Sequence, residues 1–442
     1  MLPAHCKRLT IMDGPTKGLQ TITLLSQDTR LKGRPKLCSD CGFCDSSMRP
    51  LMAQSCVFVE NRTADIERHI HGRARQTPDE QLFGVYRQML AARLRPANPQ
   101  AQWSGLVTRL GALLLERGLA NAVLTTRAVP GTRFAPQPFL ARTPAEVLAS
   151  AGNKPCLAPG LSLLDDVRAS GVRRLAVIGV GCQVHALRAA QHELGLEALY
   201  VIGIPCSDNV AYPDLQHFLE LVSGSPSTVA HFEFMQDFSV HLRHDNGQIE
   251  KVNFIDIPMA ELGDIFPSAC LACFDYANTL ADITIGYMGA PFGWQWLLAR
   301  NARGEALLDL LRSDLDLGEL TERGDRRAGV ARYAAMLAQP PKRPPALIRK
   351  LIAALMRRRG PRGLEFARSV IEMKMLRNLH YVRARFGRME RRVIPGHVYA
   401  ALEPYAEAYA QAFGRGLEPR IENQEAAQRP ALGTAPSVHI EP

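Results

Sequence analysis

Four cysteines near the start of the chain have the residue type and spacing of a metal-centre ligand set. Cys38, Cys41 and Cys44 follow one another at intervals of three in a segment that contains glycine, and Cys56 comes twelve residues later. Thiolates at this density favour iron–sulfur clusters or zinc, because soft sulfur donors suit both centres. The spacing is typical of the start of a bacterial ferredoxin run, although no Cys-Pro follows the third thiol. We expect an iron–sulfur cluster whose fourth ligand is Cys56 or a cysteine from elsewhere; a zinc site and an unligated set are the alternatives.

Two further cysteines follow the ends of two predicted strands. Residues 174–180 and 199–204 are continuous apolar runs, and a predicted helix over 183–194 connects them, which is typical of parallel strands covered on both faces. Cys182 and Cys206 come directly after these strands. Parallel strands end at the same edge of a sheet, so we expect the two cysteines to be neighbours. Burial of both as small hydrophobic residues is the alternative.

The ten cysteines suffice for two cubane clusters, which together need eight thiolates. A second Cys-x-x-Cys pair completes the later set, so the two expected groups are Cys38, Cys41, Cys44 and Cys56, and then Cys182, Cys206, Cys270 and Cys273. We interpret Cys6 and Cys156 as non-ligands, because one lies at the chain end and the other in a predicted loop. One cysteine of either group could instead ligate the other cluster.

The elements that must position these cysteines suggest an α/β protein with a mixed, largely parallel sheet core. We divide the chain into an N-terminal iron–sulfur segment (1–75), an α/β core (76–335), a basic helical region (336–415) and a disordered tail (416–442). Within the core, apolar residues between 82 and 90 predict a helix. Alternation over 231–257 around Asp-Asn-Gly predicts a β-hairpin.

Charge is concentrated in the C-terminal half. The net charge is +10, and residues 342–392 contain sixteen Lys/Arg against three acids. This segment could attract an acidic protein, a nucleic acid or an anionic membrane, or simply form a solvated helical face. Residues 347–356 carry an apolar stripe at helical spacing, which favours docking into the core over membrane binding. No signal peptide and no transmembrane segment are expected, and the protein should be cytoplasmic.

Several long motifs resemble one known family. They are LCSDCGFCD, KPCLAPG, IGVGCQVHALR, IPCSDN, CLACFDYANTLADITIGYMGAPFGWQW and GPRGLEFARSVIEMKMLRNLHYVRARF. They resemble the factor-420-reducing hydrogenase beta-subunit family, and within it the ferredoxin-dependent 8-vinyl reductases of (bacterio)chlorophyll synthesis. The resemblance runs from Cys38 to Tyr405. The 7-hydroxymethyl chlorophyll a reductases of plants share most of these motifs.

This resemblance implies FAD and two 4Fe–4S clusters, reduced ferredoxin as electron donor, and 3,8-divinyl (proto)chlorophyllide a as substrate. The implied product is the 8-ethyl pigment. The residues that we expect at the flavin are Trp103, Ser104, Gly105, Thr108, Asn153, Lys154, Gly286, Tyr287, Met288 and Gly289. Lys154 would neutralise a phosphate. Ser104 and Gly105 at a helix start could also be an ordinary N-cap, and the glycines around Tyr287 a plain turn.

No acid–base residue stands out in the sequence. Asp208 and Tyr287, both at predicted strand ends, are weak candidates for a proton donor, with an N-cap aspartate and a packing tyrosine as the favoured roles. Two other classes of function stay open: a non-catalytic electron-transfer beta subunit of a hydrogenase or formate dehydrogenase complex, and a zinc-containing nucleic-acid-binding protein. The nucleic-acid class is disfavoured because it leaves Cys182 and Cys206 unexplained. A homo-oligomer and a peripheral membrane contact are compatible with the sequence.

Overall fold

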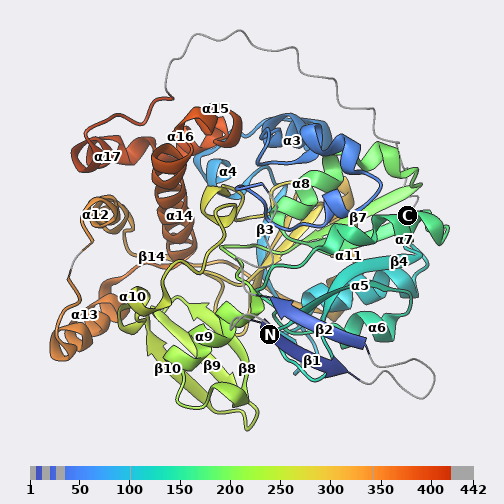
Figure 1. The fold of residues 1–442 in the computed structure, drawn as a ribbon, viewed down its shortest axis with the longest axis horizontal. Coiled ribbons are helices and arrows are strands. Elements are labelled where there is room, and N and C mark those ends of the chain that lie inside the picture. Colours follow the sequence, from blue (N-terminus) through green and yellow to red (C-terminus); the bar gives the residue numbers. More distant parts are fainter. Residues whose placement is uncertain (1–5, 12–19, 26–34, 100, 341, 420–442) are drawn as a thin grey trace.

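The computed structural model describes residues 6–11, 20–25, 35–99, 101–340 and 342–419 (Figure 1). Residues 420–442, which make up most of the predicted disordered tail, lie outside the described residues, as does the side chain of Cys6.

An eight-stranded mixed sheet forms the centre of the fold. In spatial order its strands are β13 (Leu315–Gly318), β3 (Gln88–Leu94), β12 (Gln295–Ala299), β11 (Ile283–Gly286), β7 (Ala198–Gly203), β6 (Arg174–Gly179), β4 (Ala122–Ala128) and β5 (Pro136–Ala141). The four strands from β11 to β4 run parallel, and antiparallel neighbours extend the sheet at both edges. The predicted α/β class with a mixed, largely parallel sheet is confirmed.

The predicted strand–helix–strand crossover is present. Strands β6 and β7 pair in parallel, with Val177 opposite Val201, and α8 (Gly181–Ala189) connects them. A 3-10 turn over Gln191–Leu194 follows α8. Apart from the exposed Arg174 at the start of β6, both strands are buried, because neighbouring strands and helices cover them on both faces. Cys182 and Cys206 therefore leave the sheet at the same edge.

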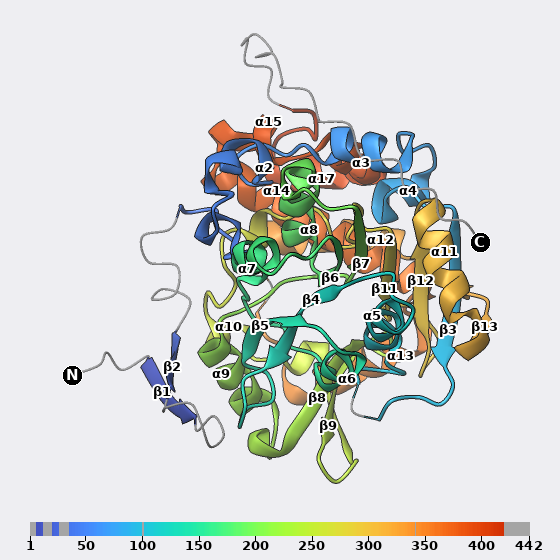
Figure 2. The same ribbon diagram turned by 90° about the vertical axis from the view of Figure 1, so that its right-hand side faces the viewer.

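Helices cover both faces of the sheet (Figure 2). The helices whose leucines pack on one face are α5 (Leu106–Glu116), α6 (Pro144–Ala149) and α11 (Ala302–Leu311). Those that pack on the other face are α3 (Thr63–His71), α7 (Leu164–Ala169) and α8. Successive residues of β6 alternate between these two cores, as the two-residue period of a strand requires.

A second, smaller sheet confirms the predicted β-hairpin and adds a strand to it. It consists of β8 (Val229–Met235), β9 (Ser239–His244) and β10 (Ile249–Asn253), all antiparallel. Gly247 has φ +80° in the turn between β9 and β10, a conformation that favours glycine. Helix α9 (Tyr212–Val222) packs against this sheet, and α10 (Met259–Leu262) follows it.

The C-terminal part is helical, as predicted. Its helices are α12 (Arg327–Ala338), α13 (Ala346–Arg359), α14 (Leu364–Arg385), α15 (Glu390–Val393), α16 (Gly396–Leu402) and α17 (Ala406–Phe413). The sequence predicts a helix over residues 364–385, which are the bounds of α14, and this helix is buried along most of its length. Its Ile371 and Leu379 share one core with Phe83 and Trp296 of the preceding region, so the C-terminal helices do not have a separate core.

The remaining elements are short. They are β1 (Cys6–Ile11), β2 (Gln20–Leu25), α2 (Met52–Ser55), α4 (Pro78–Phe83), β14 (Glu322–Arg323) and β15 (Arg362–Gly363). Strands β1 and β2 pair with each other, as do β14 and β15. Within the described ranges, none of the helices combines the length and apolar character that a membrane span requires.

The helix predicted between residues 82 and 90 is wrong. Helix α4 ends at Phe83, and residues 88–94 form β3, which pairs with β12 on one side and β13 on the other. A short apolar run is compatible with either period, and pairing with two neighbouring strands here outweighs the local pattern.

The prediction that the apolar stripe of residues 347–356 docks into the core is wrong. Leu347 and Leu351 on α13 are 80% and 70% exposed. Only a narrow inner side of the helix, at Ala353, is buried against the body. Periodicity identified the apolar face correctly, but it carries no information about whether that face meets protein or solvent.

The sequence predicts that the basic residues of segment 342–392 form one patch, but they do not all lie at the surface. Arg368, Lys374 and Arg383 are buried and form ion pairs inside the protein, whereas Arg357 and Arg358 are exposed. Arg383 also donates hydrogen bonds to the carbonyl oxygens of residues 416–418, so the first residues of the predicted tail are held against the helices.

Candidate functional site

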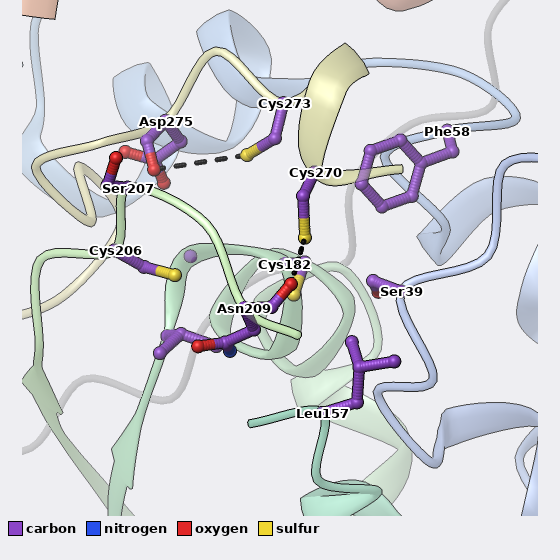
Figure 3. A pocket seen from close by; sticks show the side chains of 12 residues that line it. Ser39, Phe58, Leu157, Cys182, Cys206, Ser207, Asn209, Cys270, Cys273 and Asp275 are labelled. Atoms are coloured by element: carbon purple, nitrogen blue, oxygen red, sulfur yellow. Dashed lines mark hydrogen bonds between the residues drawn. The ribbon is translucent and has the colours of Figure 1, made fainter. Parts of the chain in front are cut away.

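Four cysteines from three separate segments line one pocket (Figure 3). Cys182 lies in the first turn of α8, and Cys206 follows the end of β7. Cys270 and Cys273 lie on and just after a one-turn 3-10 helix. The sheet edge and this turn therefore bring together the four residues predicted as the second ligand set.

The pocket is unfavourable for bare thiolates. Burial raises the pKa of Cys182, Cys206, Cys270 and Cys273, and the neighbouring cysteines raise the pKa of Cys206 further. The Sγ of Cys270 lies 3.8 Å from the carbonyl oxygen of Asn209, and the Sγ of Cys273 lies 4.0 Å from that of Asp275. Soft sulfur donors in such a dry pocket suit a cationic metal centre.

The N-terminal cysteines form a second group beside the first. Cys41 is partly buried; desolvation of its thiol raises the pKa to about 12, and Cys56, Cys38 and Cys44 are close enough to contribute to this increase. The turn between them depends on Gly42, which has φ +89° and approaches Pro159 so closely that a Cβ would lie 2.4 Å from its carbonyl oxygen.

The two cysteine groups are adjacent. Cys41 is near enough to raise the pKa of Cys182, after the larger effect of burial, and Ser39 lines the pocket of the second group. His185 of α8 binds the carbonyl oxygen of Ser55 at 3.0 Å, which ties the segment before Cys56 to the helix that carries Cys182. In the described part of the chain, no three His, Cys, Asp or Glu side chains are placed to hold a single metal ion.

Helix α14 holds the Cys270–Cys273 turn in place. The Nδ2 of Asn378 donates to the carbonyl oxygens of Cys270 at 3.0 Å and Cys273 at 2.6 Å. The Nζ of Lys374 lies 3.3 Å from the carbonyl oxygen of Cys270 and 3.2 Å from the carboxylate of Asp208. Sequence reasoning missed Asn378 and Lys374, because their only signal is membership of a buried helix.

Two of the residues predicted at the flavin form an aromatic pair. The Trp103 indole packs against the Tyr287 ring, with centroids 5.1 Å apart and the ring planes tilted by 31°, and the exposed Phe292 contacts Trp103 edge-on at 5.8 Å. Among the described residues, nothing accepts a hydrogen bond from the buried indole Nε1 of Trp103. The pair thus offers both a flat apolar surface and a free donor.

Ser104, Gly105 and Thr108 have structural roles at the start of α5. The Ser104 hydroxyl accepts from the backbone N–H of Leu94 and donates to Gln295, both at 3.1 Å. Gly105, with φ +94°, is the N-cap residue, and Thr108 donates to its carbonyl oxygen. Ser104 is therefore not the N-cap itself, and no side chain caps the first turn of α5.

Asn153 and Lys154 lie at the end of α6. The Lys154 ammonium group donates to the carbonyl oxygens of Ser150, Ala151 and Gly152, which uses all three of its protons. Burial lowers the pKa of Lys154 to about 8. Asn153 donates to the carbonyl oxygen of Phe232, and its own buried Oδ1 has no partner in the described residues. Lys154 would have to release one of these backbone carbonyls, which follow the end of α6, before it could bind a phosphate.

The glycine loop after β11 lies next to the cysteine pocket. A Cβ on Gly286 would meet Pro205, the residue before Cys206, at 2.7 Å. Tyr276 accepts the backbone N–H of Cys206 at its carbonyl oxygen and donates its hydroxyl to the sulfur of Met288 at 3.4 Å. Gly289 has φ +89° and packs against Gly363. One residue, Tyr276, thus connects the cysteine pocket to the loop that carries Tyr287.

The side chains of the two candidate proton donors, Asp208 and Tyr287, have different surroundings. Both carboxylate oxygens of Asp208 accept from Arg377 at 2.9 Å, and Lys374 is also bound, so its side chain is occupied by two cations. Tyr287 is partly buried; desolvation raises its pKa, and the nearby carboxyl of Glu233 raises it further. Burial in turn raises the pKa of Glu233 to about 7. Sequence reasoning missed Glu233, which had no signal beyond its place in an alternating strand.

Comparison with known proteins places this fold and site in a class. Residues 89–165 match the N-terminal part, and residues 172–322 the C-terminal part, of the coenzyme F420 hydrogenase/dehydrogenase beta subunit. The matched proteins are redox proteins, so this chain is of the oxidoreductase class. It belongs to the coenzyme F420 hydrogenase/dehydrogenase beta-subunit family.

Two relatives cover most of the chain. A protein of Nostoc sp. (strain PCC 7120) is 43% identical over 354 residues, which span 79% of this chain and 88% of the relative. The chloroplastic 7-hydroxymethyl chlorophyll a reductase of Oryza sativa is 40% identical over 387 residues, or 83% of this chain and 82% of the relative.

A solved structure supports the fold. It is a chain of the F420-reducing [NiFe] hydrogenase complex from Methanosarcina barkeri, with a TM-score of 0.52 and 22% identity over 69% of this chain and 94% of that chain. At this level of identity the likeness concerns the fold.

Proposed function

We propose that the protein reduces a side chain of a chlorophyll-type macrocycle, with reduced ferredoxin as the electron donor. The proposed reaction converts the 8-vinyl group of 3,8-divinyl (proto)chlorophyllide a to ethyl in (bacterio)chlorophyll biosynthesis. The proposed cofactors are two 4Fe–4S clusters and FAD. When bound, these groups would accept single electrons from ferredoxin and deliver them as the electron pair that reduction of a vinyl group requires.

The observation that carries this proposal is the pocket lined by Cys182, Cys206, Cys270 and Cys273. Its four partly buried cysteines come from segments that lie far apart in the sequence, and a second cysteine group is adjacent. Two sets of four thiolates match the needs of two cubane clusters. The chlorophyll-related relative, which is similar over most of the chain, supports the choice of pigment substrate.

The residues around the glycine loop suit a flavin. The Trp103 indole N–H and the Asn153 Oδ1 are a donor and an acceptor without partners among the described residues. Uncapped N–H groups at the start of α5 would favour a phosphate. Tyr276 keeps this loop beside Cys206, so the chain would hold flavin and cluster close together. Tyr287 with Glu233 is the proposed proton source, in preference to Asp208, which two cations occupy.

The first test is the metal and flavin content of the protein purified without oxygen. We expect about eight irons and one flavin per chain. Cys206→Ser should lose about half of the iron, because it removes a ligand of one cluster. Cys156→Ser is the control, since Cys156 is a buried cysteine that lies outside both groups. Bound zinc in place of iron would refute the proposal.

The second test identifies the substrate. The protein is incubated anaerobically with divinyl chlorophyllide and reduced ferredoxin, and the pigment is followed by absorbance and mass. An increase of two mass units with loss of the 8-vinyl group is the expected result. Reduction of 7-hydroxymethyl chlorophyll a instead would favour the second candidate, 7-hydroxymethyl chlorophyll a reductase, which the relative from Oryza sativa suggests.

The third candidate is an electron-transfer beta subunit without a substrate of its own. The likeness in fold to a chain of a hydrogenase complex favours it. It predicts a stable large partner that copurifies with the chain, and no turnover of either pigment in its absence.

A further inference from the structure

Helix α13 lies at the edge of the molecule (Figure 1), and several of its large apolar side chains are exposed. The exposed fractions are 80% for Leu347, 70% for Leu351, 51% for Leu355 and 49% for Ile348. Residues at this spacing lie on one side of a helix, so they form a continuous aliphatic strip. We call these four residues the α13 strip. Four large aliphatic side chains exposed together on one helix are unusual on a protein that has no ligand for them.

The orientation of the strip is set by contacts on the inner side of α13. Ala353 is buried, and the guanidinium of Arg349 forms an ion pair with Asp256 at 2.7 Å. Arg357 donates to Asn253 at 2.6 Å, and Arg343 binds the carbonyl oxygen of Asp256. The helix is therefore anchored to the body at both ends, and the strip keeps its outward direction.

Basic residues flank the strip, and α13 contains no acidic residue. Within its fourteen residues, ALIRKLIAALMRRR, five are Lys or Arg. Lys350, Arg358 and Arg359 are exposed, as is Lys342 just before the helix. A helix with Leu and Ile on one side and Lys and Arg around them has the composition of helices that lie in the interface of a bilayer.

The composition of the strip favours lipid over a protein partner. The side chains that dominate protein interfaces are Trp, Tyr and Arg, and Leu is under-represented among them. The strip contains only Leu and Ile and no group that could make a directional hydrogen bond. An aliphatic strip within a ring of cations instead matches acyl chains below anionic headgroups.

We propose that α13 is a membrane-docking helix that binds the surface of a bilayer containing anionic lipid. The α13 strip enters the acyl region, and Lys350, Arg358 and Arg359 contact the headgroups. This proposal concerns where the protein works and is independent of which pigment it reduces.

The test is flotation of the full-length protein with lipid vesicles at about 0.1 M salt. We expect binding to vesicles of phosphatidylcholine with an equal part of phosphatidylglycerol, and clearly weaker binding to phosphatidylcholine alone. Higher salt should weaken the binding without abolishing it, because the apolar contribution is not screened. No flotation with the anionic vesicles would overturn the proposal.

A matched pair of variants tests the residues. Ile348→Gln should weaken vesicle binding about tenfold, since it removes one aliphatic side chain from the lipid. Ile249→Gln is the control, because Ile249 on β10 is 47% exposed, nearly the same as Ile348, but lies outside α13. Equal effects of the two changes would refute the assignment. Lys350→Glu should weaken binding to anionic vesicles several-fold and leave binding to neutral vesicles unchanged.

Other occupants of the strip give different results. If a second copy of the chain covers the strip, the wild type would sediment as an oligomer and would not bind vesicles. The double variant Leu347→Gln, Leu351→Gln would then sediment as a monomer. If an acidic protein covers the strip, the wild type would bind that protein and would not bind vesicles. Both results would overturn the proposal.

Discussion

Single residues next to the cysteine pocket hold its backbone in place. Asn378 is fully buried, and its amide group satisfies two carbonyl oxygens of the Cys270–Cys273 turn. Buried carbonyl groups that lose their donor are costly, because water cannot replace it. Asn378 is thus a positioning residue that acts through the turn.

Replacing Asn378 tests this role. Asn378→Leu keeps a similar volume but removes the side-chain donor of the Cys273 carbonyl, whereas the Cys270 carbonyl keeps Lys374, and we expect a loss of about 1–3 kcal/mol in the free energy of unfolding. Iron content should also fall, since the turn carries two of the proposed ligands. The measurement is denaturant unfolding together with iron analysis. Arg385→Leu, an exposed position at the end of the same helix, should change stability by no more than about 0.5 kcal/mol. Equal behaviour of the two variants would contradict the prediction.

Because of Glu233, the free energy of unfolding should decrease as the pH rises. Its pKa is raised from 4.5 to about 7 by burial, so between these values the folded chain holds a proton that the unfolded chain releases. Its contribution to stability is complete below pH 4.5 and is lost as the pH rises through 7. Glu233→Gln cannot ionise, so its unfolding free energy relative to wild type should rise by about 2–3 kcal/mol over this window. Denaturant unfolding of both proteins across this range checks it, and a difference independent of pH would refute it.

At the scale of elements, α14 connects the basic C-terminal region to the cysteine pocket. Lys374 is nearly fully buried, yet its ammonium group lies against the backbone of Cys270 and the carboxylate of Asp208. Arg377, one turn further along the helix, binds the same carboxylate. The helix therefore places two cations and one anion beside the proposed cluster, a net positive charge that favours its reduced form.

Removing the lysine charge should change the redox potential of that cluster. In Lys374→Met, Asp208 keeps its pair with Arg377, and the positive charge near Cys270 is lost. We expect the midpoint potential to become more negative by several tens of millivolts. A redox titration followed by electron paramagnetic resonance measures it. Lys342→Met, at an exposed position before α13, should leave the potential unchanged. A shift toward positive potential in Lys374→Met would contradict the argument.

At the scale of the whole molecule, ion pairs and one shared core join regions that are distant in the sequence. Arg368 of α14 binds Asp79 of α4, Glu322 of β14 and Glu365, each at 2.8 Å. The hydrophobic core around α14 includes Phe58 and Trp296 as well as the C-terminal helices. The predicted basic region is thus part of the body, and the proposed division into segments describes the chemistry of the chain more than its folding units.

The central arginine of this network should matter for stability. Arg368→Ala leaves three carboxylates close together, two of them partly exposed, and we expect a loss of about 1–3 kcal/mol in denaturant unfolding. Arg173→Ala breaks an ion pair whose partners are 60% and 56% exposed, and should cost no more than about 0.5 kcal/mol. Similar losses in the two variants would show that the network contributes nothing beyond a surface pair.

The sequence by itself determined the features that depend on local pattern. Apolar runs placed β6 and β7, and with them Cys182 and Cys206 at one edge of the sheet. The limits of α14 and the hairpin turn at Gly247 also follow from periodicity and turn residues. Motif resemblance indicated the family before the fold was known. That the eight cysteines ligate clusters stays a prediction.

Only the tertiary structure decided which faces and which pairs these elements use. Residues 88–94 form a strand because two partner strands flank them, and the α13 strip is exposed to solvent. The tertiary structure also directed the Lys154 ammonium group to the backbone carbonyls that follow α6, and it placed Glu233 near Tyr287. The physical reason is that periodicity records how a side chain is directed from its own backbone, whereas burial, pairing and charge depend on what a distant segment places opposite it.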